Sequence, residues 1–139
     1  MKEYLRLEEM SNRRKDKTLL PVNIWIDDSG TYINGRHAKR IKFQQNKGDK
    51  MGGQPVASMR LDGVVIKTSH YEDGNQLSES DIDEIRNFVI NNSYALDKLA
   101  DEKIKIEDFD SIMIQGGERA SDRAIEHQKD LVDILVEEC

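Results

Sequence analysis

Basic side chains are concentrated in residues 36–50, where their spacing could bind an anion. Arg40 and Lys42 are two residues apart, so on a strand they project from one face, about 7 Å from each other. Consecutive phosphates of a nucleic acid are separated by a similar distance, so two such side chains can hold a phosphodiester or a nucleotide. The predicted ligand-binding residues of this stretch are Arg36, His37, Lys39, Arg40, Lys42, Lys47 and Lys50.

Aromatic rings near the basic stretch could add stacking contacts with a nucleic-acid base. Trp25 and Tyr32 are the candidates. Phe43 is excluded, because its position in the strand pattern directs it to the core. Trp25 and Tyr32 therefore complete the predicted ligand-binding set.

The strand pattern decides where the charges point. Val22, Ile24 and Ile26 alternate with polar residues and Trp25, which predicts a strand with one apolar face. Further on, Ile41 and Phe43 share a face with His37 and Lys39, while Arg40 and Lys42 share the opposite face. The same pattern also fits an edge strand that uses positive charge to resist unwanted pairing.

A second hairpin follows at residues 56–67. Asp62-Gly63 is a two-residue turn signal between two apolar strand segments. With the earlier strands it predicts a four-stranded, mostly antiparallel sheet, and residues 32–33 could add a fifth strand. The sequence 44–54 is a polar, glycine-containing loop without the spacing of a phosphate-binding Walker loop.

Helical periodicity dominates the second half. Ser78 or Ser80 can cap a main helix that carries Ile82, Ile85 and Phe88 on one side and runs to about residue 100. Asn91-Asn92-Ser93 is expected to bend or break it. A short strand or extended link at 103–106, a short helix at 107–114 and a terminal helix capped by Ser121 follow.

These elements predict an α+β fold: a four- or five-stranded mostly antiparallel sheet packed by a main helix, with one or two C-terminal helices. We divide the chain into a charged N-terminal arm or short helix (1–20), an α+β domain (21–115) and a C-terminal helix (116–139). Residues 11–17 are expected to form a flexible basic link.

Charge is distributed unevenly along the 139 residues. Residues 1–70 carry 14 Lys and Arg against 8 Asp and Glu, whereas residues 71–139 carry 7 against 19. The basic half could meet an anion, and the acidic half a cationic partner or the basic half of a second copy. A homodimer through the terminal helix is a related hypothesis.

No apolar run is long enough to span a membrane, and the N-terminus lacks the apolar stretch of a signal peptide, so we expect a cytoplasmic protein. The single cysteine, Cys139, and three scattered histidines argue against a disulfide or a zinc site. The paired carboxylates, such as Asp27-Asp28, are explained by turns and helix starts. No motif specifies a reaction, and no cofactor is expected.

The leading hypothesis is therefore a non-enzymatic binding protein that holds a nucleotide-like ligand, a nucleic acid or an acidic protein on its basic strand and loop. The alternative is an inhibitor of the phage or mobile-element type, whose acidic C-terminal half blocks a basic, nucleic-acid-binding protein surface. Length and charge-rich composition suggest that type, without any shared motif. A third hypothesis is a small phosphodiesterase with His37 as general acid.

Overall fold

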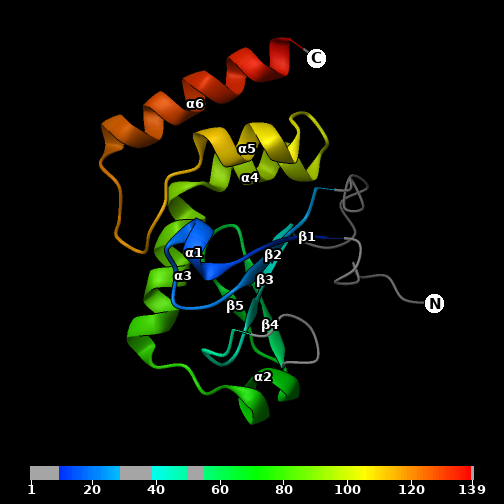
Figure 1. Cartoon of the computed structure of the whole chain (residues 1–139), viewed down its shortest axis with the longest axis vertical. Helices are drawn as coiled ribbons and strands as arrows, with labels where there is room; N and C mark the ends of the chain where they lie inside the picture. Colours follow the sequence, from blue (N-terminus) through cyan, green and yellow to red (C-terminus); the bar gives the residue numbers. More distant parts are fainter. Residues whose placement is uncertain (1–9, 29–38, 50–54, 139) are drawn as a thin grey trace, which may run out of the picture.

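Five strands form one antiparallel sheet in the computed structural model, which describes residues 10–28, 39–49 and 55–138 (Figure 1). Neighbours in the sheet follow the order β1-β2-β3-β4-β5, and every neighbouring pair is antiparallel. The predicted α+β fold is confirmed. The strands are β1 (Ser11–Arg13), β2 (Ile24–Ile26), β3 (Arg40–Gln44), β4 (Val56–Arg60) and β5 (Val65–Ile66).

Six helices lie in the part of the chain that the structure describes. Figure 1 shows α6 lying across α4 and α5 at one end of the molecule, whereas α2 lies at the opposite end of the sheet. The helices are α1 (Lys15–Thr18), α2 (Ser69–Gly74), α3 (Glu79–Asn91), α4 (Ser93–Ala100), α5 (Ile106–Ile112) and α6 (Asp122–Glu137).

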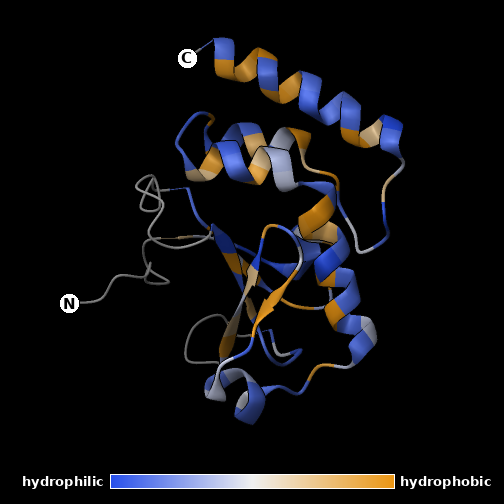
Figure 2. Ribbon diagram, turned by 180° about the vertical axis from the view of Figure 1, so that it is seen from behind, coloured by the Kyte–Doolittle hydropathy of each residue, from blue (hydrophilic) through white to orange (hydrophobic). Residues whose placement is uncertain are grey.

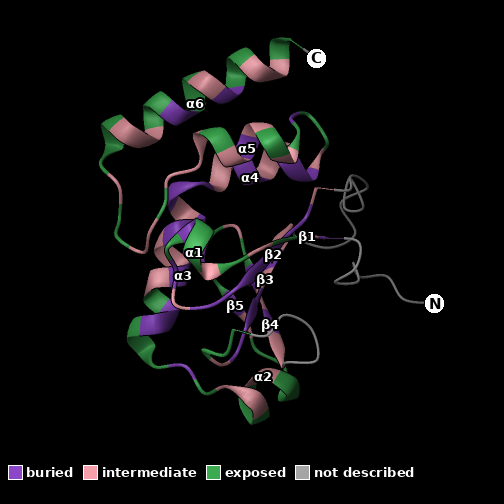
Figure 3. Ribbon diagram, in the orientation of Figure 1, coloured by how far each residue is buried: buried purple, intermediate pink, exposed green. Residues whose placement is uncertain are grey.

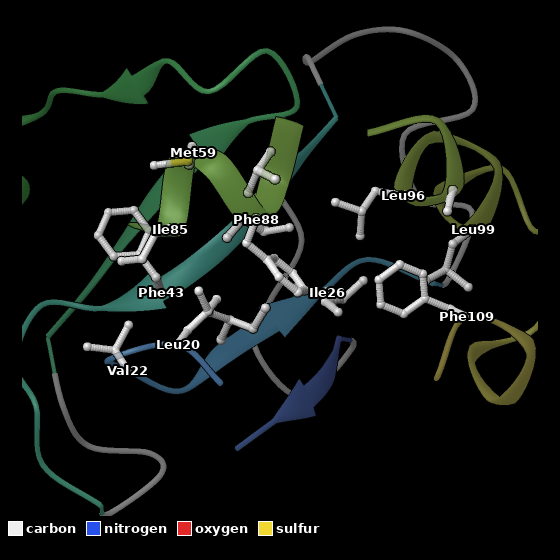
Figure 4. Close-up of a cluster of buried hydrophobic side chains, with 14 of the residues drawn as sticks. Leu20, Val22, Ile26, Phe43, Met59, Ile85, Phe88, Leu96, Leu99 and Phe109 are labelled. Carbon is white, nitrogen blue, oxygen red and sulfur yellow. The ribbon is translucent and has the colours of Figure 1, made fainter. Parts of the chain in front are cut away.

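One face of the sheet and the apolar sides of α3 and α4 form a single buried cluster (Figures 3 and 4). Register places Ile24 beside Phe43 and Ile26 beside Ile41, so the predicted alternation puts these four side chains on the same face. All four are almost fully buried. The helices contribute Ile82, Ile85, Phe88, Val89, Leu96 and Leu99 to the same cluster.

The prediction of a flexible link at residues 11–17 was wrong. Residues 11–13 form β1, which pairs with β2, and residues 15–18 form α1. Arg13 Nε and Nη2 donate to the two carboxylate oxygens of Asp110 at 2.7 and 2.8 Å. This bidentate pair joins residues 97 positions apart, so no local pattern could reveal it.

The second hairpin has a three-residue loop rather than the predicted two-residue turn. Arg60 N donates to Val64 O, and Gly63 N donates to Arg60 O, which closes the loop over residues 61–63. Gly63 adopts φ 89°, the left-handed conformation that such a loop requires at its last residue. The resulting register pairs Ser58 with Ile66 and Met59 with Val65.

The predicted break in the main helix is confirmed and separates α3 from α4. Asn92 lies at the junction, where its side chain is fully buried. Its Nδ2 donates to Phe88 O and Ile114 O, and its Oδ1 accepts from Ile114 N and from Gln128 Nε2 of α6. One amide thus connects the helix junction, the 113–120 segment and α6.

Asn87 and Asn91, which lie one helical turn apart on α3, also form hydrogen bonds with the 113–120 segment. Asn87 Nδ2 donates to Gly117 O at 2.9 Å, and Asn91 exchanges hydrogen bonds with the backbone of Glu118 and Ala120. Polar side chains therefore fix a stretch that has no regular secondary structure of its own.

The terminal helix is confirmed with its predicted cap, since Ser121 Oγ accepts from Ala124 N at 3.1 Å. Hydrophobic and hydrophilic residues alternate along α6 (Figure 2), and its buried Val132 and Gln128 anchor it to the rest of the molecule. Residues 103–106 do not form the short strand that was one of the two predictions for them, and Ile106 already begins α5, whereas Ile104 is buried. The strand expected at residues 32–33, the start of the basic strand at 36–38 and most of the N-terminal helix lie outside the described residues.

Replacing Asn92 with Ala should lower the free energy of unfolding by about 3 kcal/mol, because it removes four hydrogen bonds and leaves buried polar groups without partners. Urea unfolding would measure this. Asn87→Ala, which removes one hydrogen bond to Gly117 O, is the matched control and should cost about 1 kcal/mol. Equal losses in the two variants would contradict the central role of Asn92.

Candidate anion-binding site

The basic strand occupies the centre of the sheet. β3 pairs with β2 on one side and with β4 on the other, so its charges do not protect an exposed edge. Arg40 and Lys42 point to the face opposite the buried Ile41 and Phe43, as predicted. The edge-strand explanation of this charge is therefore wrong.

Arg40 and Lys42 line a common hollow of about 540 Å³ on the outer face of the sheet. Its other side chains come from β4, β5 and the start of α2. Two carry hydroxyl groups, one is an imidazole, and the apolar ones are aliphatic. The described lining residues are Arg40, Lys42, Val56, Ala57, Ser58, Ile66, Thr68 and His70.

The register of β3 and β4 places positively charged side chains next to each other beside this hollow. Arg40 lies directly opposite Arg60 on β4, and Lys42 lies opposite Ser58. Like charges placed opposite each other on adjacent strands disfavour the pairing. Arg60 also forms an ion pair with Asp62 at 2.5 Å, in which both side chains are about half exposed, so solvent weakens it.

Lys39 lies elsewhere, on the side of β3 that faces α4. Its Nζ donates to Asp97 Oδ1 at 2.8 Å and to Asp101 Oδ2 at 2.7 Å. Burial disfavours the charged amine, but the hydrogen bonds and charges of Asp101 and Asp97 outweigh it and raise the pKa of Lys39 above 10.5. Lys39 therefore joins the sheet to α4 and is not part of the hollow.

Lys47 also meets a carboxylate of the second half of the chain. Its Nζ lies 3.1 Å from Oδ1 of Asp81, whose side chain is only 8% exposed. Asp81 is the third residue of the capping box of α3, in which Ser78 is the N-cap. Burial disfavours the charged carboxylate, yet hydrogen bonds from Ser78 and Lys47 lower the pKa of Asp81 below 3.8.

Trp25 is buried, with 4% of its surface exposed, although it lies opposite Lys42 in the register. Its ring is thus part of the packed interior rather than an open stacking platform. The remaining predicted residues, Tyr32, Arg36, His37 and Lys50, lie outside the described residues. Of the nine predicted site residues, the structure brings Arg40 and Lys42 together in the hollow.

Ser58, Thr68 and His70 were missed by sequence reasoning. The sequence signal that could have found them is the hairpin at residues 56–67, because its register determines which residues lie next to β4. Since Ser58 pairs with Ile66, continuing the chain past β5 returns residues 68–70 alongside the start of β4. Gln45 Nε2 reinforces this return by donating to Val56 O and to His70 O. A correct register would have placed these side chains beside Lys42.

No described residues form a group of three or more His, Cys, Asp or Glu that could hold a metal ion. No described helix is both long and apolar enough to cross a membrane. The hollow combines cations and hydroxyl groups, which is the chemistry of anion binding.

Comparisons with protein-family models, curated proteins and solved structures found no match to this chain. The case for a function therefore depends on the geometry of the hollow.

The Asp81 site predicts a pH-dependent stability. Because its pKa is lower in the folded than in the unfolded state, Asp81 stabilises the fold above pH 3.8, and this contribution is lost as pH falls further. Asp81→Asn should lower the free energy of unfolding by about 1 kcal/mol at pH 7 and by progressively less as the pH falls below 3.8. Urea unfolding at several pH values would measure both.

Asp73→Asn is the matched control, because Asp73 is an exposed carboxylate without a hydrogen bond or ion pair to the described residues. It should have little effect at either pH. A loss at Asp81 that does not vary with pH would contradict the stabilising role of its charge.

Proposed function

We propose that this chain is a non-enzymatic binding protein that holds an anionic partner in the hollow on the outer face of its sheet. The observation that carries the proposal is that Arg40 and Lys42 project from the central strand into one concave surface. Charge at the centre of a sheet does not serve to prevent edge pairing.

Chemistry in the hollow favours a phosphate-bearing ligand. Arg40 offers a planar fork of donors suited to phosphate or carboxylate oxygens, and Lys42 adds a compact charge about 7 Å along the strand. The hydroxyl groups of Ser58 and Thr68 can donate further hydrogen bonds. Val56 and Ile66 provide a small apolar surface for a sugar or an alkyl group.

Among the predicted partners, a nucleotide-like ligand fits the hollow best. Among the described residues the lining contains no Trp, Tyr or Phe, so they offer no platform on which successive bases of a single strand could stack. A longer nucleic acid or an acidic protein would have to bind Arg40 and Lys42 without a stacking contact. We expect the protein to act in the cytoplasm, where phosphorylated ligands are abundant.

Reversing both charges with Arg40→Glu and Lys42→Glu should weaken binding of an anionic probe at least about tenfold, a loss of about 1.4 kcal/mol. Three fluorescent probes would separate the partner classes: a nucleoside triphosphate, a 12-nucleotide single-stranded DNA and a polyglutamate peptide. Anisotropy titrations would measure the affinities, and the affinity of the wild-type protein should fall with added salt.

Arg119→Glu with Arg123→Glu is the matched control, because it changes the net charge equally on exposed residues near the start of α6. This variant should bind like the wild type. If both double variants lose affinity equally, net charge rather than the hollow governs binding, and the proposed site is wrong.

The alternative function, an inhibitor of a basic protein surface, has its own supporting observation. Helix α6 exposes Glu126, Asp130 and Glu137, and Ile134 is 52% exposed beside them. If this function holds, Glu126→Gln, Asp130→Asn and Glu137→Gln together should abolish capture of the partner from source cells. The Arg40 and Lys42 variants should then retain it. The opposite pattern would support the hollow instead.

A further inference from the structure

A second hollow, of about 390 Å³, lies beside β5 at one edge of the sheet. It shares no lining residue with the anion-binding hollow. No described strand pairs with the outer side of β5. The lining consists of Asp62, Gly63, Val64, Val65, Lys67, Tyr71, Glu79, Ile82 and Arg86.

The hydrogen-bond pattern directs backbone groups of β5 toward this hollow. Arg60 N donates to Val64 O at 2.9 Å, so these two residues form a hydrogen-bonded pair of the antiparallel ladder. The next pair, Met59 with Val65, is then the non-hydrogen-bonded type. The N–H and C=O of Val65 consequently point away from β4, to the outer edge of the sheet.

Backbone groups next to Val65 already have hydrogen-bond partners, so Val65 is the residue at which a peptide could dock. The carbonyl of Gly63, one position before Val64, already accepts from Arg86 Nε of α3 at 2.9 Å. The Val64 amide donates to Asp62 Oδ1 in the loop. Val65 therefore presents a donor and an acceptor together beside a concave surface, and a second extended backbone matches both at once.

The position of Val65 in the sheet also predicts which kind of side chain a bound peptide would place opposite it. A residue paired with Val65 would project its side chain to the same face as Val65, which belongs to the buried face of the sheet. There the hollow is lined by Ile82 of α3 and Tyr71 of α2, so an apolar side chain fits. Lys67 and Glu79 contribute one charge of each sign, which favours a segment without net charge.

We propose that the outer edge of β5 binds an extended peptide segment of another protein, which adds to the sheet as a further strand. An apolar residue of the peptide lies opposite Val65 and extends the buried face over the start of α3. This surface is independent of the proposed anion site, so either proposal can fail without the other.

Amide NMR on the ¹⁵N-labelled full chain would test the proposal. The probe is a capped, uncharged pentapeptide with valine at its centre, flanked by serine and threonine, titrated to millimolar concentration. The Val65 amide should shift and exchange more slowly with solvent, while Arg40 and Lys42 should not change. The same peptide with an N-methylated central valine loses one backbone donor and should bind at least about tenfold more weakly.

Val64→Lys, which places a charge on the edge strand at a residue 49% exposed, should also weaken binding severalfold. Ile134→Lys on α6 makes the same change at a residue 52% exposed and should have no effect. The proposal would be overturned by an unperturbed Val65 or by equal affinity of the N-methylated peptide. Concentration-dependent shifts of Val65 without peptide would equally overturn it, because they would assign the edge to a second copy.

Discussion

The alternation of side chains along β3 is the constraint on which the rest of the molecule depends. β3 is the central strand, so its buried face must complete the core through Ile41 and Phe43 while both its edges are paired. Successive residues of a strand point to opposite faces, so the same five residues send Arg40 and Lys42 to the other side. A slip of one residue would bury two charges and expose two large apolar side chains. Core formation therefore enforces the position of the cations.

Electrostatic contacts between the two halves of the chain explain much of its uneven charge. Arg13 binds Asp110, Lys39 binds Asp97 and Asp101, and Lys47 binds Asp81. Each pair joins a cation of the basic half to a carboxylate of the acidic half. Part of the opposite charge of the two halves is therefore paired within one molecule. Composition alone could not show which charges pair within the molecule.

The two hollows use different properties of one sheet. The hollow lined by Arg40 and Lys42 depends on side chains from the outer face, whereas the hollow beside β5 depends on backbone groups at the edge. α2 contributes to both, through His70 to the first and Tyr71 to the second. Because α2 has no buried residue, its position depends on contacts such as the Gln45 hydrogen bonds and the Thr68 cap. A ligand that displaced α2 would alter both surfaces.

The sequence by itself determined the fold class, the break at Asn91-Asn92, the Ser121 cap and the opposite facing of Arg40 and Ile41. All of these follow from short-range periodicity or from capping chemistry, which act within a few residues. Only the tertiary structure decided that β3 is central, that residues 11–13 form a strand and that Lys39 is bound to α4. It also brought Ser58, Thr68 and His70 beside Lys42, because a three-residue loop at Gly63 set the register. Strand order, register and long-range ion pairs join residues far apart in the chain, and no local pattern encodes such contacts.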